Sequence, residues 1–270
     1  MKHFILDYDG VVTNNKAITD PQVVKQLVQL ARKGHKIDLA TGRPMRFLET
    51  DFLPHLRKLT QAFPHLRDSF ILSAENGLEI ARFKRGKKKT LAAIGKGVAA
   101  REITLFRRIL AKHRFKNITF DKDKQHMFTM YATTKQLYSN PDAVQSDLDR
   151  AEVVLKDAVK STPHLSVRRT LYAVDVIDPT AEKHLVGERA LKEARLDTHF
   201  VVVGDAASDL LLAKPIHHAG RSYEFHFVGH HDQLSDKVAR QVIGSHKIIV
   251  HRAAALHNEG TRLVLNKHLR

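Results

Sequence analysis

Cysteine is absent from the 270-residue sequence, and there is no long apolar run, low-complexity tract or clear internal repeat. Without cysteine the chain can form no disulfide bond, no thiolate metal site and no cysteine nucleophile. The longest apolar runs are too short to span a bilayer, and Asp7 interrupts any signal-peptide core near the N-terminus. We therefore expect a cytoplasmic protein.

Acidic residues are scarce relative to basic ones. The sequence has 29 Asp and Glu against 45 Lys and Arg, which gives a formal net charge of +16, and its 18 histidines add positive charge at acidic pH. Such a surface attracts anions, so nucleic acids, phosphorylated metabolites and acidic lipids all stay open as partners. The charge is explained equally well by a source whose proteins are basic in general. The length fits one large domain or two modest ones.

Strand and helix signals alternate over the first part of the chain. Phe4 to Leu6 is an apolar run that stops at Asp7, as a buried parallel strand does before a loop. Asp20-Pro21 is a helix-start signal, and an apolar face with helical spacing follows it as far as Gly34. Further strands are predicted at Lys36 to Ala40, Ser69 to Ser73 and Leu78 to Ala81.

The pattern changes after a basic run from Lys84 to Lys89, which predicts a polar linker or a hairpin tip. The elements beyond it follow the order αββαββ, which is typical of a small α+β module with an antiparallel sheet. We predict helices at Val98 to Lys112 and from Asn140 to about Lys160, and strands at Asn117 to Phe120, His126 to Ala132, His164 to Arg168 and Leu171 to Ile177.

Alternation resumes after Asp178-Pro179. Helices are predicted at Ala181 to Ala194, from Ser208 to Ala213 and from Asn258, and strands at Phe200 to Val203, Glu224 to Val228 and Lys247 to Val250. The fold class is therefore α/β: a Rossmann-like parallel-sheet core with an inserted α+β cap. We place the core domain at residues 1–81 and 178–270 and the cap at 82–177.

Polar and acidic side chains follow three of the predicted core strands. Asp7 and Asp9 follow the first, Thr41 the second, and Asp205 and Asp209 a later one. Ligands of open parallel sheets bind beyond the carboxyl ends of the strands, so these side chains converge if their strands are neighbours. Crowded carboxylates repel each other unless a cation lies among them, and hard oxygen ligands suit Mg²⁺.

A basic residue completes the candidate site. Lys183, early in the helix after the cap, can contact phosphate oxygens as a point charge, while a bound cation neutralises the approaching phosphate. Each residue alone has an ordinary explanation: aspartates after strands cap helices or form turns, and most helix lysines are solvated. The conjunction at several strand ends is what indicates a phosphate-handling site.

These motifs together resemble the haloacid dehalogenase superfamily of phosphohydrolases. Four motifs occur in the family's order, and the resemblance spans nearly the whole chain. They are Asp7-Tyr8-Asp9-Gly10-Val11-Val12-Thr13, then Thr41 in Ala40-Thr41-Gly42-Arg43, then Lys183, then Gly204-Asp205-Ala206-Ala207-Ser208-Asp209. Asn76-Gly77 also looks like the segment that precedes the cap in one subgroup.

The resemblance implies a role for each aspartate. Asp7 would be the nucleophile that forms an aspartyl-phosphate. Asp9 would protonate the leaving oxygen and then activate water. Mg²⁺ would be held by Asp7, the backbone carbonyl of Asp9 and Asp205, with Asp209 orienting the site.

The resemblance also implies how a phosphorylated small molecule binds. Thr41 and Lys183 would contact the transferred phosphoryl group. Gly42, Arg43 and Ser208 are expected at the substrate, with Arg43 suited to a second anionic or hydroxyl-rich group.

The cap narrows the resemblance to one subgroup. An αββαββ insert between the second and third motifs looks like the branch of sucrose phosphatases, sugar phosphatases and phosphomannomutases, whose cap closes over the core and selects the leaving group. Two residues depart from that branch: Ser208 stands where Asn is usual, and His184 follows the lysine where Gly is common. Neither departure removes the nucleophile or a metal ligand.

The expected function is a Mg²⁺-dependent phosphatase acting on a small phosphate monoester of the sugar-phosphate type. A phosphomutase with the same aspartates is the alternative among enzymes. A basic nucleic-acid-binding protein is the alternative from another class, although the Lys84 to Lys89 run lacks interleaved aromatic residues for base stacking. A catalytically silent regulator is a third possibility, against which the intact acidic set argues.

Overall fold

The computed structural model describes residues 1–14, 17–91, 96–170, 172–230, 234, 243–244 and 248–270. The chain divides into a core unit, Met1–Ile94 with Glu182–Arg270, and an inserted unit, Gly95–Ala181. The insert begins later than the predicted Arg82 and ends four residues after the predicted Ile177 (181 − 177). Leu171 and Lys247, the first residues of two predicted strands, lie outside the described residues.

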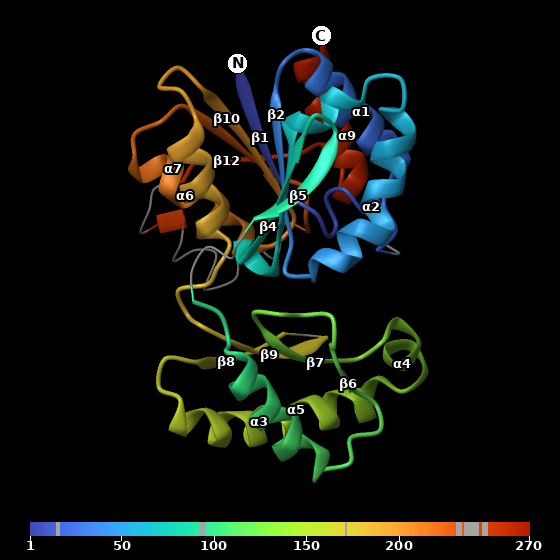
Figure 1. The fold of residues 1–270 in the computed structure, drawn as a ribbon, viewed down its shortest axis with the longest axis vertical. Helices are drawn as coiled ribbons and strands as arrows, with labels where there is room; N and C mark the ends of the chain where they lie inside the picture. Colours follow the sequence, from blue (N-terminus) through green and yellow to red (C-terminus); the bar gives the residue numbers. More distant parts are fainter. Residues whose placement is uncertain (15–16, 92–95, 171, 231–233, 235–242, 245–247) are drawn as a thin grey trace. The chain divides into compact units, whose positions relative to one another are not determined.

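One twisted sheet forms the centre of the core unit (Figure 1). Its strand order is β12-β11-β10-β1-β2-β3-β4-β5, parallel from β12 to β3 and antiparallel from β3 to β5. The strands are β1 Lys2–Asp7, β2 Lys36–Ala40, β3 Phe70–Ala74, β4 Glu79–Lys84, β5 Lys87–Leu91, β10 His199–Gly204, β11 Tyr223–Phe227 and β12 Val250–Arg252.

Helices cover both faces of this sheet, as the predicted α/β class requires (Figure 1). One face packs against α1 Pro21–Arg32, α2 Met45–Leu59 and α9 His257–Leu269, and the other against α6 His184–Glu193 and α7 Leu210–His218. Short 3₁₀ turns lie at η1 Pro64–Ser69, η2 Glu75–Gly77 and η4 Ala207–Asp209. Because both faces are covered, Phe4, Ile5 and Leu6 of β1 are all fully buried. Asp20 caps α1 as predicted, accepting a hydrogen bond of 2.8 Å from the Gln22 N–H.

The linker predicted at Lys84 to Lys89 is wrong, and its alternative as a hairpin tip is right. Strands β4 and β5 pair antiparallel across Arg85 and Gly86 and extend the core sheet at its edge. The Asp68 carboxylate accepts hydrogen bonds from the N–H groups of both turn residues, at 2.9 and 2.8 Å. Lys88 forms an ion pair with Glu49, so the basic run is partly committed to the fold.

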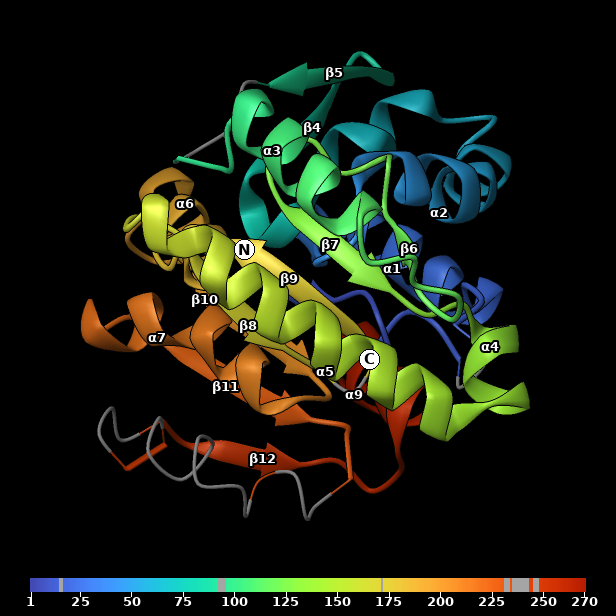
Figure 2. The same cartoon turned by 90° about the horizontal axis from the view of Figure 1, so that it is seen from below.

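The inserted unit is an antiparallel sheet with helices on one face (Figure 2). Its strand order is β6-β7-β9-β8, and α3 and α5 pack on the sheet. This confirms the predicted αββαββ order, except for one added helix, α4. The bounds are α3 Ala100–Ala111, β6 Thr119–Phe120, β7 Phe128–Tyr131, α4 Thr134–Ser139, α5 Pro141–Ala158, η3 Val159–Ser161, β8 Ser166–Arg169 and β9 Ala173–Ile177.

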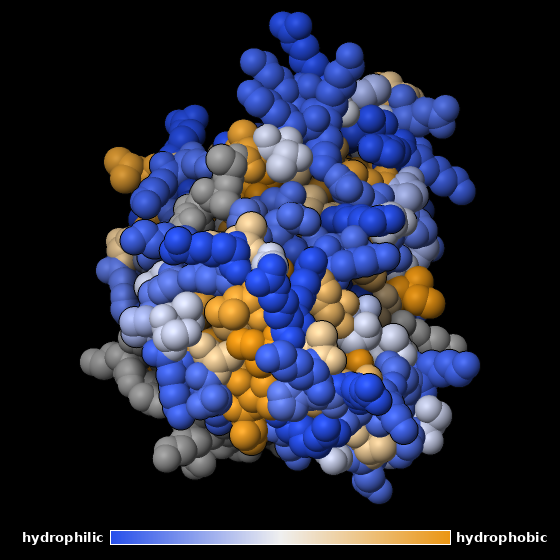
Figure 3. All heavy atoms as spheres, turned by 60° about the horizontal axis from the view of Figure 1, so that its bottom comes forward, coloured by the Kyte–Doolittle hydropathy of each residue, from blue (hydrophilic) through white to orange (hydrophobic). Residues whose placement is uncertain are grey.

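The hydrophilic character of the sequence is visible on the surface of the molecule. Hydrophilic residues cover most of the face drawn in Figure 3, with a group of hydrophobic ones near its centre. Among the described residues, no helix is both long and apolar enough to span a membrane.

Candidate active site

The strand order brings the predicted acidic residues together at the carboxyl ends of neighbouring strands of the core sheet. Strand β1 lies between β10 and β2, with Asp7 in register with Ala40 and Leu6 in register with Val203. The residues that follow these three strand ends are therefore neighbours, as the sequence predicted. The Tyr8 N–H donates to the Ala40 carbonyl at 2.8 Å and extends the β1–β2 pairing into the loop.

A tight turn after β1 sets the positions of the first two aspartates. The Tyr8 carbonyl accepts hydrogen bonds from the N–H groups of Val12 and Thr13, at 3.0 and 3.1 Å, and the Thr13 hydroxyl accepts one from the Gly10 N–H at 2.9 Å. Gly10 has a φ of +71°, which glycine adopts without strain. A Cβ atom at Gly10 would lie 1.9 Å from Oδ2 of Asp205, so only glycine lets that carboxylate approach the turn.

Lys183 joins two of the carboxylates. Its Nζ lies 2.6 Å from Oδ1 of Asp7 and 2.5 Å from Oδ1 of Asp209, and all three side chains are nearly buried. The other oxygen of Asp209 accepts hydrogen bonds from the N–H groups of Asp205 and Ala206, both at 2.9 Å. Both oxygens of Asp209 are thus committed to holding Lys183 and the loop after β10.

Burial and mutual repulsion shift the proton affinities of this cluster. Burial raises the pKa of Asp7 well above its ordinary value, and the charge of Asp209 adds to the rise while Lys183 opposes it. Burial and the charge of Asp209 likewise raise the pKa of Asp205 to about 7. Burial acts to lower the pKa of Lys183, but the charges of Asp209 and Asp7 together raise it. Without a cation, the surroundings of Asp7 and Asp205 therefore favour a proton on each.

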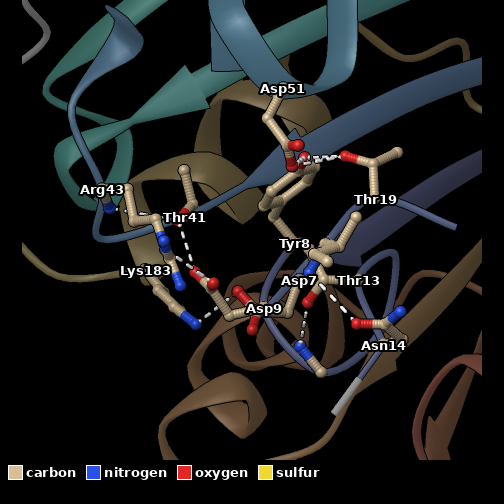
Figure 4. A network of polar contacts seen from close by, with 12 residues as sticks. Asp7, Tyr8, Asp9, Thr13, Asn14, Thr19, Thr41, Arg43, Asp51 and Lys183 are labelled. Atoms are coloured by element: carbon tan, nitrogen blue, oxygen red, sulfur yellow. Dashed lines mark hydrogen bonds and ion pairs between the residues drawn. The ribbon is translucent and has the colours of Figure 1, made fainter. Parts of the chain in front are cut away.

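Asp9 is held by residues of the second motif. The Thr41 hydroxyl donates a hydrogen bond of 2.9 Å to Oδ2 of Asp9, and Nε of Arg43 lies 2.7 Å from its Oδ1 (Figure 4). The Arg43 N–H in turn donates to the Thr41 hydroxyl at 3.0 Å. The Arg43 guanidinium lies over the Phe47 ring, 4.1 Å from its centroid, which further fixes its orientation.

The remaining predicted residues lie at the edge of this group. Gly42 adjoins Asn76, whose amide oxygen would be 3.4 Å from a Cβ at position 42, and the Asn76 N–H donates to the Thr41 carbonyl at 2.9 Å. Ser208 is half-buried in η4, and His184 begins α6. Across the part of the chain that the structure describes, neither of these two side chains has a hydrogen bond or ion pair to the aspartates.

Sequence reasoning did not identify the residues that hold the turn after β1 on the side away from Asp7 and Asp9. The buried Tyr8 side chain extends away from Asp7 and Asp9, and its hydroxyl donates to Oδ2 of Asp51 at 2.6 Å (Figure 4). The Thr19 hydroxyl donates to the same oxygen at 2.6 Å. A tyrosine between the two aspartates of the motif was the available signal, but its partner on α2 could not be identified from spacing.

His257, the first residue of α9, is a second residue that the sequence did not reveal. Its Nδ1 lies 3.6 Å from Oδ2 of Asp205 and is buried. Burial and the neighbouring His230 lower the pKa of His257. Its imidazole therefore stands beside the acidic cluster in neutral form at neutral pH, from a position some 250 residues further along the chain (257 − 7).

The donor set fits a hard divalent cation. Asp7, Asp205 and Asp209 each offer a carboxylate oxygen, and these atoms lie within 4.8 Å of one another. Carboxylate oxygens are the ligands that Mg²⁺ prefers. Since both oxygens of Asp209 already accept hydrogen bonds, Asp7 and Asp205 are the better placed as direct ligands, with Asp209 orienting them.

Comparison with known proteins bears on the fold. No protein-family model and no curated protein matches the sequence. The C-terminal domain of trehalose-6-phosphate phosphatase from C. albicans is similar to this chain at a TM-score of 0.65 and 16% identity, over 99% of this chain and 92% of that one. A haloacid dehalogenase-like hydrolase from Bacteroides thetaiotaomicron is similar at a TM-score of 0.64 and 15% identity, over 99% of both chains.

A third similar structure is the C-terminal domain of a Candida albicans trehalose synthase regulatory protein, at a TM-score of 0.61 and 9% identity, over 98% of this chain and 93% of that one. Two of these structures are a phosphatase and a hydrolase by name, and one is a regulatory protein, so the likeness does not by itself carry an activity. What these alignments do show is the architecture: this chain has the fold of the haloacid dehalogenase-like hydrolases.

Proposed function

We propose that this protein is a Mg²⁺-dependent phosphatase that hydrolyses a small phosphate monoester through an aspartyl-phosphate on Asp7. The observation that carries the proposal is the convergence of Asp7, Asp9 and Asp205 at the carboxyl ends of adjacent parallel strands, where Lys183 reaches Asp7 from the start of α6. The ion pairs of the nearly buried Lys183 with Asp7 and Asp209 support it further.

In the proposed reaction an oxygen of Asp7 attacks phosphorus while the ester P–O bond breaks. Asp9 gives its proton to the departing oxygen. In the second half, Asp9 takes a proton from water, whose oxygen attacks the phosphorus of the aspartyl-phosphate and restores the Asp7 carboxylate. Bound Mg²⁺ would keep Asp7 ionised and neutralise charge on the phosphoryl oxygens.

Lys183 and Thr41 are the side chains that we propose to contact the phosphoryl oxygens. Lys183 contacts Asp7 directly, so an oxygen of a phosphoryl group on Asp7 falls within its reach. Thr41 and Arg43 each contact one oxygen of the Asp9 carboxylate (Figure 4). Two fixed contacts on Asp9 reduce the orientational freedom that it would have to lose in the transition state.

The substrate class is the finer part of the proposal. The names of the similar structures include trehalose-6-phosphate phosphatases, and the insert has the αββαββ order of the sugar-phosphatase branch. We therefore place sugar phosphates first among substrates. A phosphomutase remains the enzyme alternative, because the same aspartates would serve it.

The test is release of inorganic phosphate from a panel of sugar phosphates, nucleotides, pyridoxal phosphate and flavin mononucleotide, with and without Mg²⁺. Asp7→Asn should reduce the rate by on the order of 10⁴-fold or more while the protein keeps its fold. The matched control is Asp197→Asn, which changes an aspartate with 68% of its side chain exposed, and it should hydrolyse at the wild-type rate. Undiminished hydrolysis by Asp7→Asn would falsify the nucleophile assignment. Isomerised sugar phosphate without phosphate release would identify the mutase instead.

A further inference from the structure

A second group of ligand-type side chains lies at the other end of the core sheet. Glu224 and His226 are on β11, and His268 is near the end of α9. They neighbour His199, the first residue of β10, whereas Asp205 follows the last residue of the same strand. The length of β10 separates the two groups, roughly 20 Å at the usual rise per residue.

Glu224 is the centre of this group. Its Oε1 lies 2.8 Å from Nε2 of His199, and its Oε2 lies 3.0 Å from Nε2 of His226. Glu224 and His226 alternate along β11, so they face the same side of the sheet, the side covered by α9. The His251 ring, in register with His226 on β12, lies 5.4 Å from it between centroids.

His268 completes the group from the helix. Its ring centroid is 6.4 Å from that of His226. Its Nδ1 faces the ammonium group of Lys2 at 2.8 Å, and its Nε2 is buried with no hydrogen-bond partner in the described part of the chain. The ammonium group of Lys2 therefore already contacts Nδ1 of His268. Its Nε2 lacks the hydrogen-bond partner that a buried polar atom normally has.

The three side chains present donor atoms that lie within 4.8 Å of one another. His226 is nearly buried, with 6% of its side chain exposed, and Glu224 is half-buried, with 33% exposed.

We propose that Glu224, His226 and His268 bind a divalent transition-metal ion of the Zn²⁺ class. Two imidazoles and one carboxylate suit Zn²⁺, Co²⁺ or Ni²⁺, whereas the all-oxygen site at Asp7 suits Mg²⁺. Donor atoms around tetrahedral zinc lie on the order of 3.3 Å apart, so small side-chain rotations close the site. His199 holds the second oxygen of Glu224 and acts as the outer partner that metal-ligating carboxylates usually have.

This site would link the C-terminal helix to the sheet and leave the phosphatase chemistry unchanged. The ligands come from β11 and from α9, so a bound ion cross-links two elements that otherwise meet through packing. The ammonium group of Lys2 competes with the ion for His268. Because this group lies at the end of a flexible methylene chain, it can move away toward solvent.

The experiment is calorimetric titration of the full-length protein with ZnCl₂ in excess Mg²⁺, and with CoCl₂ followed by visible absorption. We expect one Zn²⁺ per chain. Glu224→Gln and His268→Gln should each weaken Zn²⁺ binding more than tenfold and reduce the Co²⁺ absorption bands. His65→Gln, which changes an exposed histidine of η1, should bind Zn²⁺ as the wild type does.

Two further variants make the outcome specific. Lys2→Met should tighten Zn²⁺ binding several-fold by removing the competing charge, the opposite of what a general loss of structure produces. Asp205→Asn should leave the Zn²⁺ stoichiometry unchanged, because it alters only the carboxylate site. Absence of Zn²⁺ binding, wild-type affinity in both ligand variants, or loss of the ion in Asp205→Asn would each overturn the proposal.

Discussion

Replacing Gly10 by alanine is expected to weaken cation binding strongly and to lower the stability of the fold only slightly. Gly10 has a φ of +71°, and an added Cβ atom would stand 1.9 Å from Oδ2 of Asp205. Ordinary van der Waals contact begins at about 3.4 Å, so that oxygen must retreat by roughly 1.5 Å (3.4 − 1.9). Asp205 can do so because it is the end of a side chain with 21% of its surface exposed.

The consequence for a bound cation is larger than that for stability. Mg²⁺ requires oxygens near 2.0–2.1 Å in close to octahedral geometry, so a shift of about 1.5 Å removes Asp205 as a ligand. We expect the apparent affinity for Mg²⁺ to fall by at least 10- to 100-fold, since disturbing even the outer partners of metal ligands costs that much. Alanine at positive φ costs about 1–2 kcal/mol of stability, a few degrees in the unfolding midpoint for a chain of this size.

Gly34 provides the matched control. It has a φ of +80°, and a Cβ atom there would meet nothing within 4 Å. Gly34→Ala should therefore lose the same 1–2 kcal/mol while binding Mg²⁺ as the wild type does. The assay is calorimetric Mg²⁺ binding together with thermal unfolding for wild type and both variants. Wild-type affinity in Gly10→Ala, or an equal loss in Gly34→Ala, would refute the steric argument.

Two other expectations concern charge. The raised pKa of Asp205, about 7 against an ordinary 3.8, means that the metal-free folded state keeps a proton that the unfolded chain has lost, so its stability should fall as pH rises from about 4 to 7. Mg²⁺ binds the ionised carboxylate, so its stabilising effect in thermal unfolding should grow across that window, and a constant increment from pH 5 to 8 would contradict this. Arg189→Met should leave the buried Asp38 carboxylate without its ion-pair partner and cost about 3–5 kcal/mol in urea unfolding. Arg195→Met, in an exposed pair, should cost less than about 1 kcal/mol.

Much of the core could be predicted because its signals are local. Strands buried on both faces produce short apolar runs, and the run from Phe4 to Leu6 ends at the loop that carries Asp7 and Asp9. Helix α1 carries its own start signal in Asp20-Pro21. The order of the strands could not be read in the same way, because β10 lies beside β1 although the two are far apart in the sequence. The right-handed crossover rule limits the possible topologies without fixing which strands are neighbours, so the meeting of these strand ends was predicted only as a condition.

Helix α2 and strand β5 of the core unit were not predicted, for identifiable reasons. Helix α2 contains Pro54 in its interior, where proline normally ends or kinks a helix, and no side chain caps its start at Met45. Strand β5 is the edge of the sheet, and three lysines from Lys87 to Lys89 give it the composition of a solvated linker. Lysine is also what edge strands carry to prevent pairing with other chains, so composition alone could not separate the two.

The residues that support the site could not be predicted from local sequence patterns. Tyr8 and Asp51 meet because α2 packs beside the turn, and His257 reaches Asp205 from the start of the last helix. Such contacts depend on how helices pack on the sheet, which no spacing rule encodes. Sequence motifs therefore pointed to the groups that we propose to react, but not to the side chains that hold them.

The arrangement of the carboxylates connects the acidity of the site with the cation that we propose for it. Asp209 is paired with Lys183 and accepts hydrogen bonds from two backbone N–H groups, so its carboxylate is fixed in place. Asp7 and Asp205 have no such complete compensation, and burial beside Asp209 raises the pKa of each. A proton or a divalent cation can supply the missing positive charge, but a protonated Asp7 is a poor nucleophile. In the proposed reaction the cation is therefore required twice: to keep Asp7 ionised before substrate arrives, and to offset the phosphoryl charge afterwards.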